Sequence, residues 1–199
     1  MDNLLHPGAQ PSSLPSALRD LAAHISLVIL DVDGVLTDGT LVYGEQGEVV
    51  KQFNAKDGLG IRLMQSVGIE VAVITARKSP ILARRMTDLR IKRYYTGYDN
   101  KINAYNALLQ DANISPDHIA YVGDDILDLP VMRKVMLPIA VRDAHFVVKN
   151  ESKWVVDATG GHGAVREVAD GLIAARTNLV DAYNEFLRTH VGCTGLEDA

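Results

Sequence analysis

Cysteine is almost absent from this sequence: Cys193 is the single example among 199 residues. That scarcity excludes a disulfide framework and a cysteine-rich zinc site. Basic residues are fewer than acidic ones, 20 against 25, so the chain has no overall positive field to attract nucleic acid. The sequence also lacks a run of about 20 apolar residues and the basic, then apolar, start of a signal peptide. We therefore expect a cytoplasmic protein that binds neither nucleic acid nor membrane.

The composition predicts one globular domain. Apolar residues make up 47% of the chain and charged residues 23%, which is ordinary for a globular protein. A chain of this length buries roughly 70% of the surface that its unfolded form exposes, so its core needs no disulfide or structural metal for stability. Three prolines within residues 1–16 disfavour a regular buried face there. We expect an N-terminal arm with a short helix over 1–24, a single domain over 25–190 and a mobile tail over 191–199.

Short apolar runs alternate with helical patterns along most of the chain. The apolar runs have strand length and lie at 25–30, 69–75, 118–123 and 136–141, and a further short strand is expected at 93–96. Helical patterns come after the first four of these five predicted strands, at 58–67, 80–89, 99–112 and 126–134. Strands that are apolar on both faces and are joined by helices are typical of a parallel sheet covered on both sides. The predicted fold class is therefore α/β, with a doubly wound, mostly parallel, Rossmann-like sheet.

Other segments depart from this alternation. Residues 41–53 hold two alternating stretches around a tight turn at 45–48, which predicts a β-hairpin flap. A short helix is expected near 144–149. Residues 164–189 have the pattern of one long amphipathic helix, whose simplest role is packing.

Chemically active side chains follow the predicted strands where those strands end. Asp31 and Asp33 follow the first strand, Thr75 ends the second, and Asp124 and Asp125 follow the fourth. Lys101 opens the helix after the third strand. In doubly wound folds the ligand lies outside the carboxyl ends of the strands. The sequence therefore predicts that these side chains converge at one edge of the sheet.

The carboxylates in this set predict a metal ion. Asp31 and Asp33 are separated by one residue, so in extended chain both point to the same side and can share a ligand. Adding Asp124 or Asp125 brings together charges whose repulsion requires a cation. Carboxylate oxygen favours a hard ion, and the small number of protein ligands favours Mg²⁺ over Ca²⁺.

The same set can perform phosphoryl transfer, which depends on positioning and charge stabilisation. Asp31 can act as the nucleophile that forms an aspartyl-phosphate. Asp33 can protonate the leaving oxygen and later activate water. Lys101 and the Thr75 hydroxyl can bind the remaining phosphoryl oxygens.

Four stretches at these strand ends carry a family resemblance. The segments VILDVDGVLTDG and VAVIT, the residue Lys101 and the segment YVGDDILD resemble, in order and spacing, the four motifs of the haloacid dehalogenase-like phosphatases. Many members insert a cap domain between the first and second or the second and third motifs. The intervals here have room for a hairpin and a helix, then a helix and a strand, so we expect no cap. A site without a cap stays wet unless another subunit closes it, and the hairpin is the natural donor of such contacts.

Within the capless group the chain is similar to the phosphatases of 3-deoxy-D-manno-octulosonate 8-phosphate, over roughly residues 25–167. The segments that carry this are FNAKDGLGIRLM, ITARKS, the region of Lys101, YVGDDILDLPVM and GGHGAVREV. The resemblance implies a magnesium-dependent phosphatase of lipopolysaccharide core biosynthesis that is a homotetramer. It implies Mg²⁺ ligation by the side chains of Asp31 and Asp124 and by the backbone carbonyl of Asp33. It implies that the sugar acid phosphate contacts Asp33, Asn54, Ala55, Lys56, Asp57, Gly58, Arg62, Arg77, Arg85 and Lys101.

Alternatives remain open at this point. A related nine-carbon sugar acid phosphate differs little from the eight-carbon one. A phosphoacceptor receiver module also gathers acids, Thr and Lys at a sheet edge, but the third strand here ends in Thr96 and has no Asp to phosphorylate. The second motif has Ala76 where the family usually has glycine. The sequence also leaves open whether Arg84 or Arg85 faces the site, whether Asp125 or Asp128 touches the metal, and what His162 does.

Overall fold

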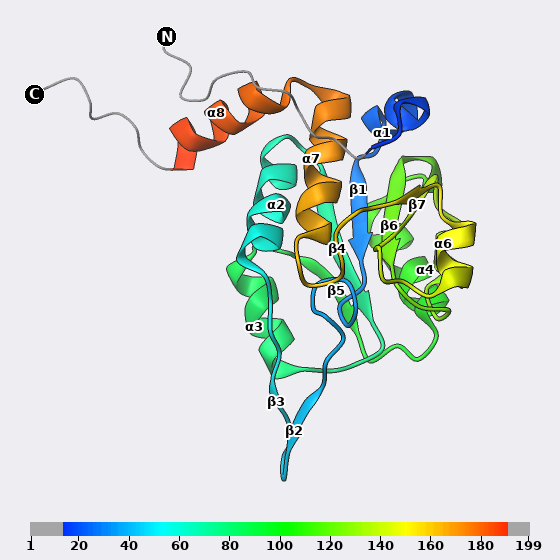
Figure 1. The fold of residues 1–199 in the computed structure, drawn as a ribbon. Helices are drawn as coiled ribbons and strands as arrows, with labels where there is room; N and C mark the ends of the chain where they lie inside the picture. Colours follow the sequence, from blue (N-terminus) through cyan, green and yellow to red (C-terminus); the bar gives the residue numbers. More distant parts are fainter. Residues whose placement is uncertain (1–13, 191–199) are drawn as a thin grey trace, which may run out of the picture.

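A parallel sheet forms the centre of the computed structural model, which describes residues 14–190 (Figure 1). Within those residues the strand order is β5-β4-β1-β6-β7-β8, and every neighbouring pair is parallel. The strands are β1 (Leu27–Leu30), β4 (Glu70–Thr75), β5 (Arg93–Thr96), β6 (Ile119–Gly123), β7 (Leu137–Ala140) and β8 (Trp154–Val155). The predicted doubly wound α/β class is confirmed, and the two-residue strand β8 is an addition that its length hid from the sequence.

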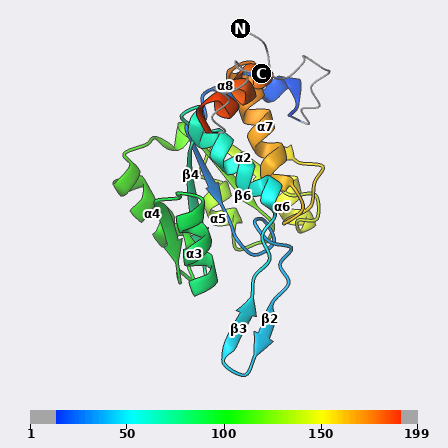
Figure 2. The ribbon, with the colours of Figure 1, turned by 90° about the vertical axis from the view of Figure 1, so that its left-hand side faces the viewer.

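Helices cover both faces of this sheet (Figures 1 and 2). They are the 3-10 turn η1 (Ser16–Leu18), α1 (Arg19–Ala23), α2 (Ala55–Ser66), α3 (Pro80–Asp88), α4 (Lys101–Ala112), the 3-10 turn η2 (Pro116–His118), α5 (Leu129–Met132), α6 (Phe146–Glu151), α7 (Ala164–Arg176) and α8 (Leu179–His190). Helices α1 and α2 both pack on α7, whereas α4 packs on α5. Among the described residues no helix combines the length and the apolar character needed to cross a bilayer.

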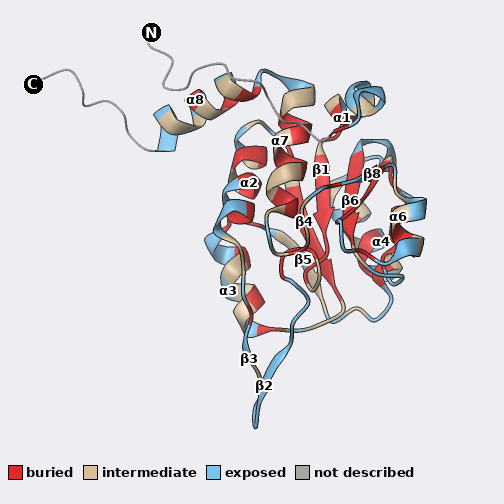
Figure 3. Cartoon of the chain, viewed as in Figure 1, coloured by how far each residue is buried: buried red, intermediate tan, exposed pale blue. Residues whose placement is uncertain are grey.

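The core lies between the sheet and these helices. All residues of β1 and β6 are buried, as the red strands of Figure 3 show. Strands buried on both faces need side chains that are apolar throughout, which explains why they were recognisable as continuous apolar runs. The buried strands hold the loops at their carboxyl ends in fixed positions.

The hairpin of β2 (Val42–Gly44) and β3 (Gly47–Val50) projects away from the sheet (Figures 1 and 2). Tyr43 and Val49 are exposed on it. Between β1 and β4 the chain forms this hairpin and α2, and between β4 and α4 it forms α3 and β5. No cap domain therefore interrupts the described part of the chain, as expected.

The predicted long C-terminal helix is wrong, because the chain forms two helices there. Thr177 is extended, with φ −154° and ψ 178°, and ends α7. The side chain of Asn178 accepts hydrogen bonds from the backbone N–H groups of Val180 and Asp181, at 2.9 and 3.2 Å, and so starts α8. A β-branched residue followed by a capping Asn is a helix-ending signal that the amphipathic pattern concealed.

Two other boundaries differ from the prediction. Helix α5 starts at Leu129 rather than Ile126, because Pro130 fits only the first turn of a helix. The packed body also begins earlier than Ile25, since Leu14 and Ala22 belong to the main core. Residues 1–13 and the predicted tail at 191–199, including Cys193, lie outside the described residues.

Candidate active site

The strand order places the predicted site residues side by side. β1 lies between β4 and β6, so Asp31 after β1, Thr75 at the end of β4 and Asp124 after β6 lie at the same edge of the sheet. They share a cavity of about 290 Å³ there. Its lining consists of Asp31, Asp33, Thr75, Ala76, Arg77, Lys101, Asp124, Asp125, Leu127 and Asp128. The structure thus brings together all four predicted catalytic residues, all three predicted metal ligands and Arg77.

Lys101 is the cation at the centre of this carboxylate cavity. Its Nζ lies 2.8 Å from Asp31 Oδ2 and 2.6 Å from Asp128 Oδ1. Burial acts to lower the pKa of Lys101, but the charges of Asp31 and Asp128 outweigh it and the pKa lies above its usual value. Lys101 therefore remains an ammonium beside Asp31.

Asp128 organises the loop that carries Asp124. It is fully buried, and its Oδ2 accepts the backbone N–H groups of Asp124 and Asp125 at 3.0 and 3.2 Å. Its Oδ1 accepts the Tyr121 hydroxyl at 2.6 Å as well as Lys101. The sequence left open whether Asp128 touches the metal or is only an acidic residue of the following helix. Its position four residues after Asp124 was the signal that could have connected it with the site. In the structure Asp128 fixes the second acidic loop and joins the carboxylate cluster.

The electrostatics of the cavity fit a divalent cation. Oxygen atoms of Asp31, Asp124 and Asp128 lie within 4.8 Å of one another. Burial and the Asp128 charge raise the pKa of Asp31 to about 7, and burial and the Asp31 charge raise that of Asp124 to about 8. The Oδ1 atom of Asp124 is buried with no hydrogen-bond partner. A hard cation would satisfy that oxygen and offset the repulsion, and magnesium accepts such oxygen donors.

Glycine is required beside this cluster. Gly34 has φ +97°, and a Cβ placed there would lie 2.1 Å from Asp124 Oδ2. An alanine would therefore combine a left-handed backbone with a collision against a cavity carboxylate. The glycine after Asp33 thus allows the loop of β1 to approach the loop of β6.

Asp33 is held by the hairpin. Its Oδ1 receives a hydrogen bond from Lys51 Nζ, and its Oδ2 lies 3.9 Å from Arg77 Nε. The side chain of Asp33 is 20% exposed, whereas that of Lys51 is 2% exposed. Sequence reasoning missed Lys51, because the motifs give no reason to connect the end of β3 with the end of β1.

Arg77 lies between the second motif and the hairpin. Its backbone N–H donates to Thr75 Oγ1 at 3.3 Å, and its guanidinium donates to the Tyr43 hydroxyl. The side chain is 38% exposed, so a ligand entering the cavity can reach it. Ala76 lines the same cavity, where its methyl group replaces the open space of the usual glycine.

The predicted substrate segment 54–58 forms the cap and first turn of α2. Asn54 caps the helix by accepting the Lys56 N–H at 2.8 Å and donates to the Gly161 carbonyl at 3.2 Å. Ala55 and Lys56 are exposed in the first turn, away from the cavity lining. None of Asn54, Ala55, Lys56, Asp57 and Gly58 lines the carboxylate cavity.

Asp57 has a structural position between α2 and α7, and its contact with substrate stays a prediction. It is 1% exposed, and its two oxygens accept the backbone N–H groups of Gly163 and Arg166 at 3.2 and 2.8 Å. A carboxylate suits those groups because they open α7 and carry the positive end of its dipole. Within one chain Asp57 therefore joins α2 to α7.

The structure separates the arginines. Arg84 is exposed and pairs with Asp88 at 3.2 Å, whereas Arg85 faces α2 and donates to the Asn54 carbonyl at 3.4 Å. Gly58 makes this approach possible, since a Cβ there would lie 2.4 Å from Arg85 Nη2. Arg85 Nε is buried without a hydrogen-bond partner, so Arg85, not Arg84, has a free donor on this side.

Arg62 and His162 do not line the carboxylate cavity. Arg62 donates to Gln65 at 2.7 Å, one turn further along α2. His162 Nδ1 lies 2.8 Å from the Gly160 carbonyl oxygen, within its own loop.

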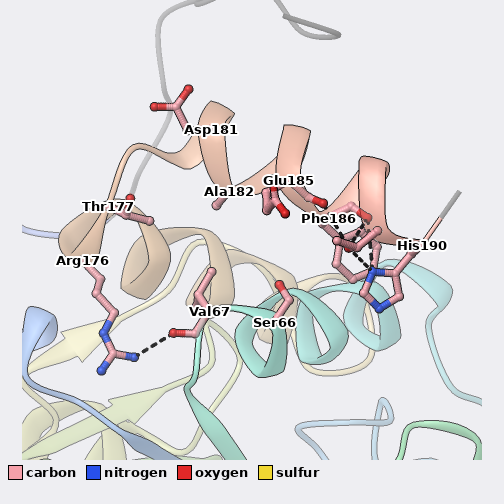
Figure 4. Close-up of a pocket in the computed structure, with 10 residues that line it drawn as sticks. Ser66, Val67, Arg176, Thr177, Asp181, Ala182, Glu185, Phe186 and His190 are labelled. Carbon is pink, nitrogen blue, oxygen red and sulfur yellow. Dashed lines mark hydrogen bonds between the residues drawn. The ribbon is translucent and has the colours of Figure 1, made fainter. Parts of the chain in front are cut away.

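A larger groove of about 660 Å³ lies between the end of α2 and α8 (Figure 4). Ser66 and Val67, at the end of α2, face Phe186 and His190 on α8. Arg176 donates to the Val67 carbonyl at 3.3 Å. The groove is remote from the carboxylate cavity, because α2 ends at the amino ends of the strands.

Comparisons with known proteins agree with this chemistry. A family model described as haloacid dehalogenase-like hydrolase matches residues 95–168. The chain is 47% identical to 3-deoxy-D-manno-octulosonate 8-phosphate phosphatase KdsC of Salmonella typhi over 82% of this chain and 87% of that protein.

Two solved structures extend the likeness to the fold. The phosphatase of that name from Yersinia pestis is 43% identical, with a TM-score of 0.80 over 82% of this chain and 89% of that one. The Moraxella catarrhalis phosphatase, solved in complex with a magnesium ion, a phosphate ion and a KDO molecule, is 35% identical, with a TM-score of 0.79 over 87% of this chain and 97% of that one.

Proposed function

The chain belongs to the haloacid dehalogenase-like hydrolases, among the 3-deoxy-D-manno-octulosonate 8-phosphate phosphatases, and from this premise we propose that it hydrolyses that sugar acid phosphate to 3-deoxy-D-manno-octulosonate and phosphate. It is accordingly a phosphoric monoester hydrolase, and the alternative of a receiver module falls away. The observation that carries the proposal is the shared cavity of Asp31, Lys101 and Asp124 at the ends of adjacent strands. The relatives' substrate supports the choice of the eight-carbon acid.

Magnesium is the proposed cofactor. The buried oxygen of Asp124 without a partner and the raised pKa values of Asp31 and Asp124 fit a hard divalent ion, and a magnesium ion is present in the Moraxella catarrhalis complex. The side chains of Asp31 and Asp124 and the backbone carbonyl of Asp33 would hold it. When bound, it neutralises negative charge on a phosphoryl oxygen and on the surrounding carboxylates.

Asp31 is the proposed nucleophile. One of its carboxylate oxygens attacks phosphorus, and the bond between phosphorus and the sugar oxygen breaks, which leaves an aspartyl-phosphate on Asp31. Lys101 Nζ, 2.8 Å from Asp31 Oδ2, stabilises the charge on the transferred group. The Thr75 hydroxyl, buried at the end of β4, donates to another phosphoryl oxygen.

Asp33 is the proposed acid and base. It gives its proton to the departing sugar oxygen in the first step. In the second step it removes a proton from the water that attacks phosphorus, and phosphate and the free Asp31 carboxylate result. Arg77 is well placed to bind the sugar acid, because its half-exposed planar guanidinium borders both the cavity and Asp33.

A homotetramer is part of the proposal. The hairpin exposes Tyr43, Val49 and Val50 on two strands that stand clear of the sheet, and the cavity has no cap within residues 14–190. Exposed apolar strands favour association, and a neighbouring copy would exclude water from the site. We further propose that the protein acts in the cytoplasm. Its product, 3-deoxy-D-manno-octulosonate, would serve as a sugar of the lipopolysaccharide core.

Phosphate release tests the activity. The protein with magnesium should hydrolyse the eight-carbon acid phosphate, and either a chelator or Asp31→Asn should reduce kcat by at least about 10³-fold, because the nucleophile or the charge compensation is lost. Asp88→Asn, on the exposed face of α3, is the matched control and should keep full activity. Full turnover by Asp31→Asn would contradict the nucleophile assignment.

A substrate panel tests the sugar. The kcat/KM for the eight-carbon acid phosphate should exceed those for the nine-carbon analogue and for simple phosphate esters. A preference for the nine-carbon compound would replace the substrate and keep the chemistry. Equal values for all esters would refute the sugar acid assignment.

Light scattering tests the assembly. Val49→Asp should lower the solution mass and the activity together, because a charge at that exposed strand position opposes association. Val155→Asp, at an exposed position of the edge strand β8, should change neither. A wild-type monomer with full activity would overturn the tetramer.

A further inference from the structure

The base of the hairpin contains a buried lysine. Lys51, immediately after β3, has a side chain that is 2% exposed. Its Nζ donates to Asp33 Oδ1 and lies 3.1 Å from Glu48 Oε1. A buried ammonium loses its hydration, so lysine is rarely buried unless carboxylates compensate it. The two acids do so here.

Glu48 connects this lysine to a second part of the site. Its Oε2 accepts the Ser79 hydroxyl at 2.5 Å, and Ser79 Oγ accepts the Leu82 N–H at 3.3 Å at the start of α3. Burial acts to raise the pKa of Glu48, but the hydrogen bonds from Ser79 and Lys51 outweigh it and the pKa lies below its usual value. The ammonium is therefore held between an anchored carboxylate and Asp33.

We propose that Lys51 is a positioning residue for the acid step: it holds Asp33 Oδ1, so that Oδ2 faces the leaving oxygen of the substrate. The inference rests on the proposed role of Asp33 as acid and base. The hydrogen bond from Lys51 engages Oδ1, so Oδ2 is the oxygen left on the cavity side. Arg77 Nε lies 3.9 Å from Oδ2 and leaves a gap on that side, because the distance exceeds that of a direct hydrogen bond.

The direction of a proton donor matters most for a poor leaving group. A sugar alkoxide needs a proton as it departs, whereas a nitrophenolate leaves without one. The value of kcat/KM covers the steps up to that departure, so it isolates the acid step from the later attack of water. Loss of Lys51 should therefore reduce kcat/KM for an alkyl phosphate and spare an aryl phosphate.

The experiment compares Lys51→Met, Lys51→Gln and Lys51→Arg with the wild type, using the sugar acid phosphate, a simple alkyl phosphate and p-nitrophenyl phosphate. The first two variants should lose about 30- to 300-fold in kcat/KM on the alkyl esters and less than about 3-fold on the aryl ester, given the size of general acid catalysis. Lys51→Arg should recover most of the loss. Lys134→Met, at an exposed surface position, is the matched control and should show no change.

Two further measurements separate positioning from folding. Thermal unfolding and magnesium affinity of each variant establish that the cavity is intact, and Lys51→Gln, which retains a donor, replaces Lys51→Met if the latter does not fold. Lys51→Met added to Asp33→Asn should cost little more than Asp33→Asn alone, because both act at the same step.

Each unfavourable outcome has a distinct meaning. An equal loss on alkyl and aryl esters, no loss on either, or additive effects with Asp33→Asn would overturn the positioning role of Lys51. If Asp33→Asn itself shows no dependence on the leaving group, the proposed acid role of Asp33 fails instead. The test compares kcat/KM for a simple alkyl phosphate and an aryl phosphate. It therefore remains valid even if the natural substrate is not the proposed sugar acid phosphate.

Discussion

Magnesium binding should depend steeply on pH, because the carboxylates that would hold the ion titrate near neutrality. The pKa of Asp31 is raised to about 7 and that of Asp124 to about 8. At pH 6 about a tenth of Asp31 and about a hundredth of Asp124 are ionised, whereas at pH 8 most of Asp31 and about half of Asp124 are. If the ion binds only when both are charged, its affinity should rise roughly 10²–10³-fold, or about 3–4 kcal/mol, from pH 6 to pH 8.

The metal-free protein should show the opposite trend in stability. Both pKa values are higher in the folded chain than in the unfolded one, so the folded chain binds more protons between about pH 4 and pH 8. The free energy of unfolding without metal therefore falls as the pH rises through that window. Magnesium should raise the melting temperature more at pH 8 than at pH 6.

Calorimetry in buffers of different ionisation enthalpy measures the protons released as the ion binds. Close to two protons should be released at pH 6 and fewer than one at pH 8. Asp124→Asn should remove about one of them at pH 6, and Asp88→Asn, at an exposed surface carboxylate, none. The same affinity at both pH values, with no proton release, would refute the link between burial and metal binding.

Three substitutions test the structural contacts through the free energy of unfolding, measured with urea. Gly34→Ala should cost more than about 2 kcal/mol, from its positive φ and its contact with Asp124, and a neutral result would refute that approach. Asp57→Ala should cost about 2–3 kcal/mol, because two backbone N–H groups of α7 lose their partner; unchanged stability with a raised KM would instead support substrate contact. Asn178→Ala should cost about 1 kcal/mol as the cap of α8 is lost, with Asn150→Ala as an exposed control.

Local sequence determined the framework of this protein. Buried parallel strands must be apolar on both faces, so β1, β4 and β6 could be identified from their residues alone. The residues at or beyond the end of each parallel strand lie at the carboxyl edge of the sheet, which predicted that Asp31, Thr75, Lys101 and Asp124 would share a cavity. Their catalytic roles stay predictions.

Tertiary structure decided the direction of each side chain and its partner. Lys51 meets Asp33 only because the chain returns from the hairpin to the end of β1, and Asp57 caps α7 across 106 residues of sequence. Arg84 and Arg85 are neighbours of identical chemistry, and only the packing of α3 on α2 turns Arg85 inward. Periodicity identifies strands and helices because it depends on neighbouring residues, but these pairings depend on how the elements pack.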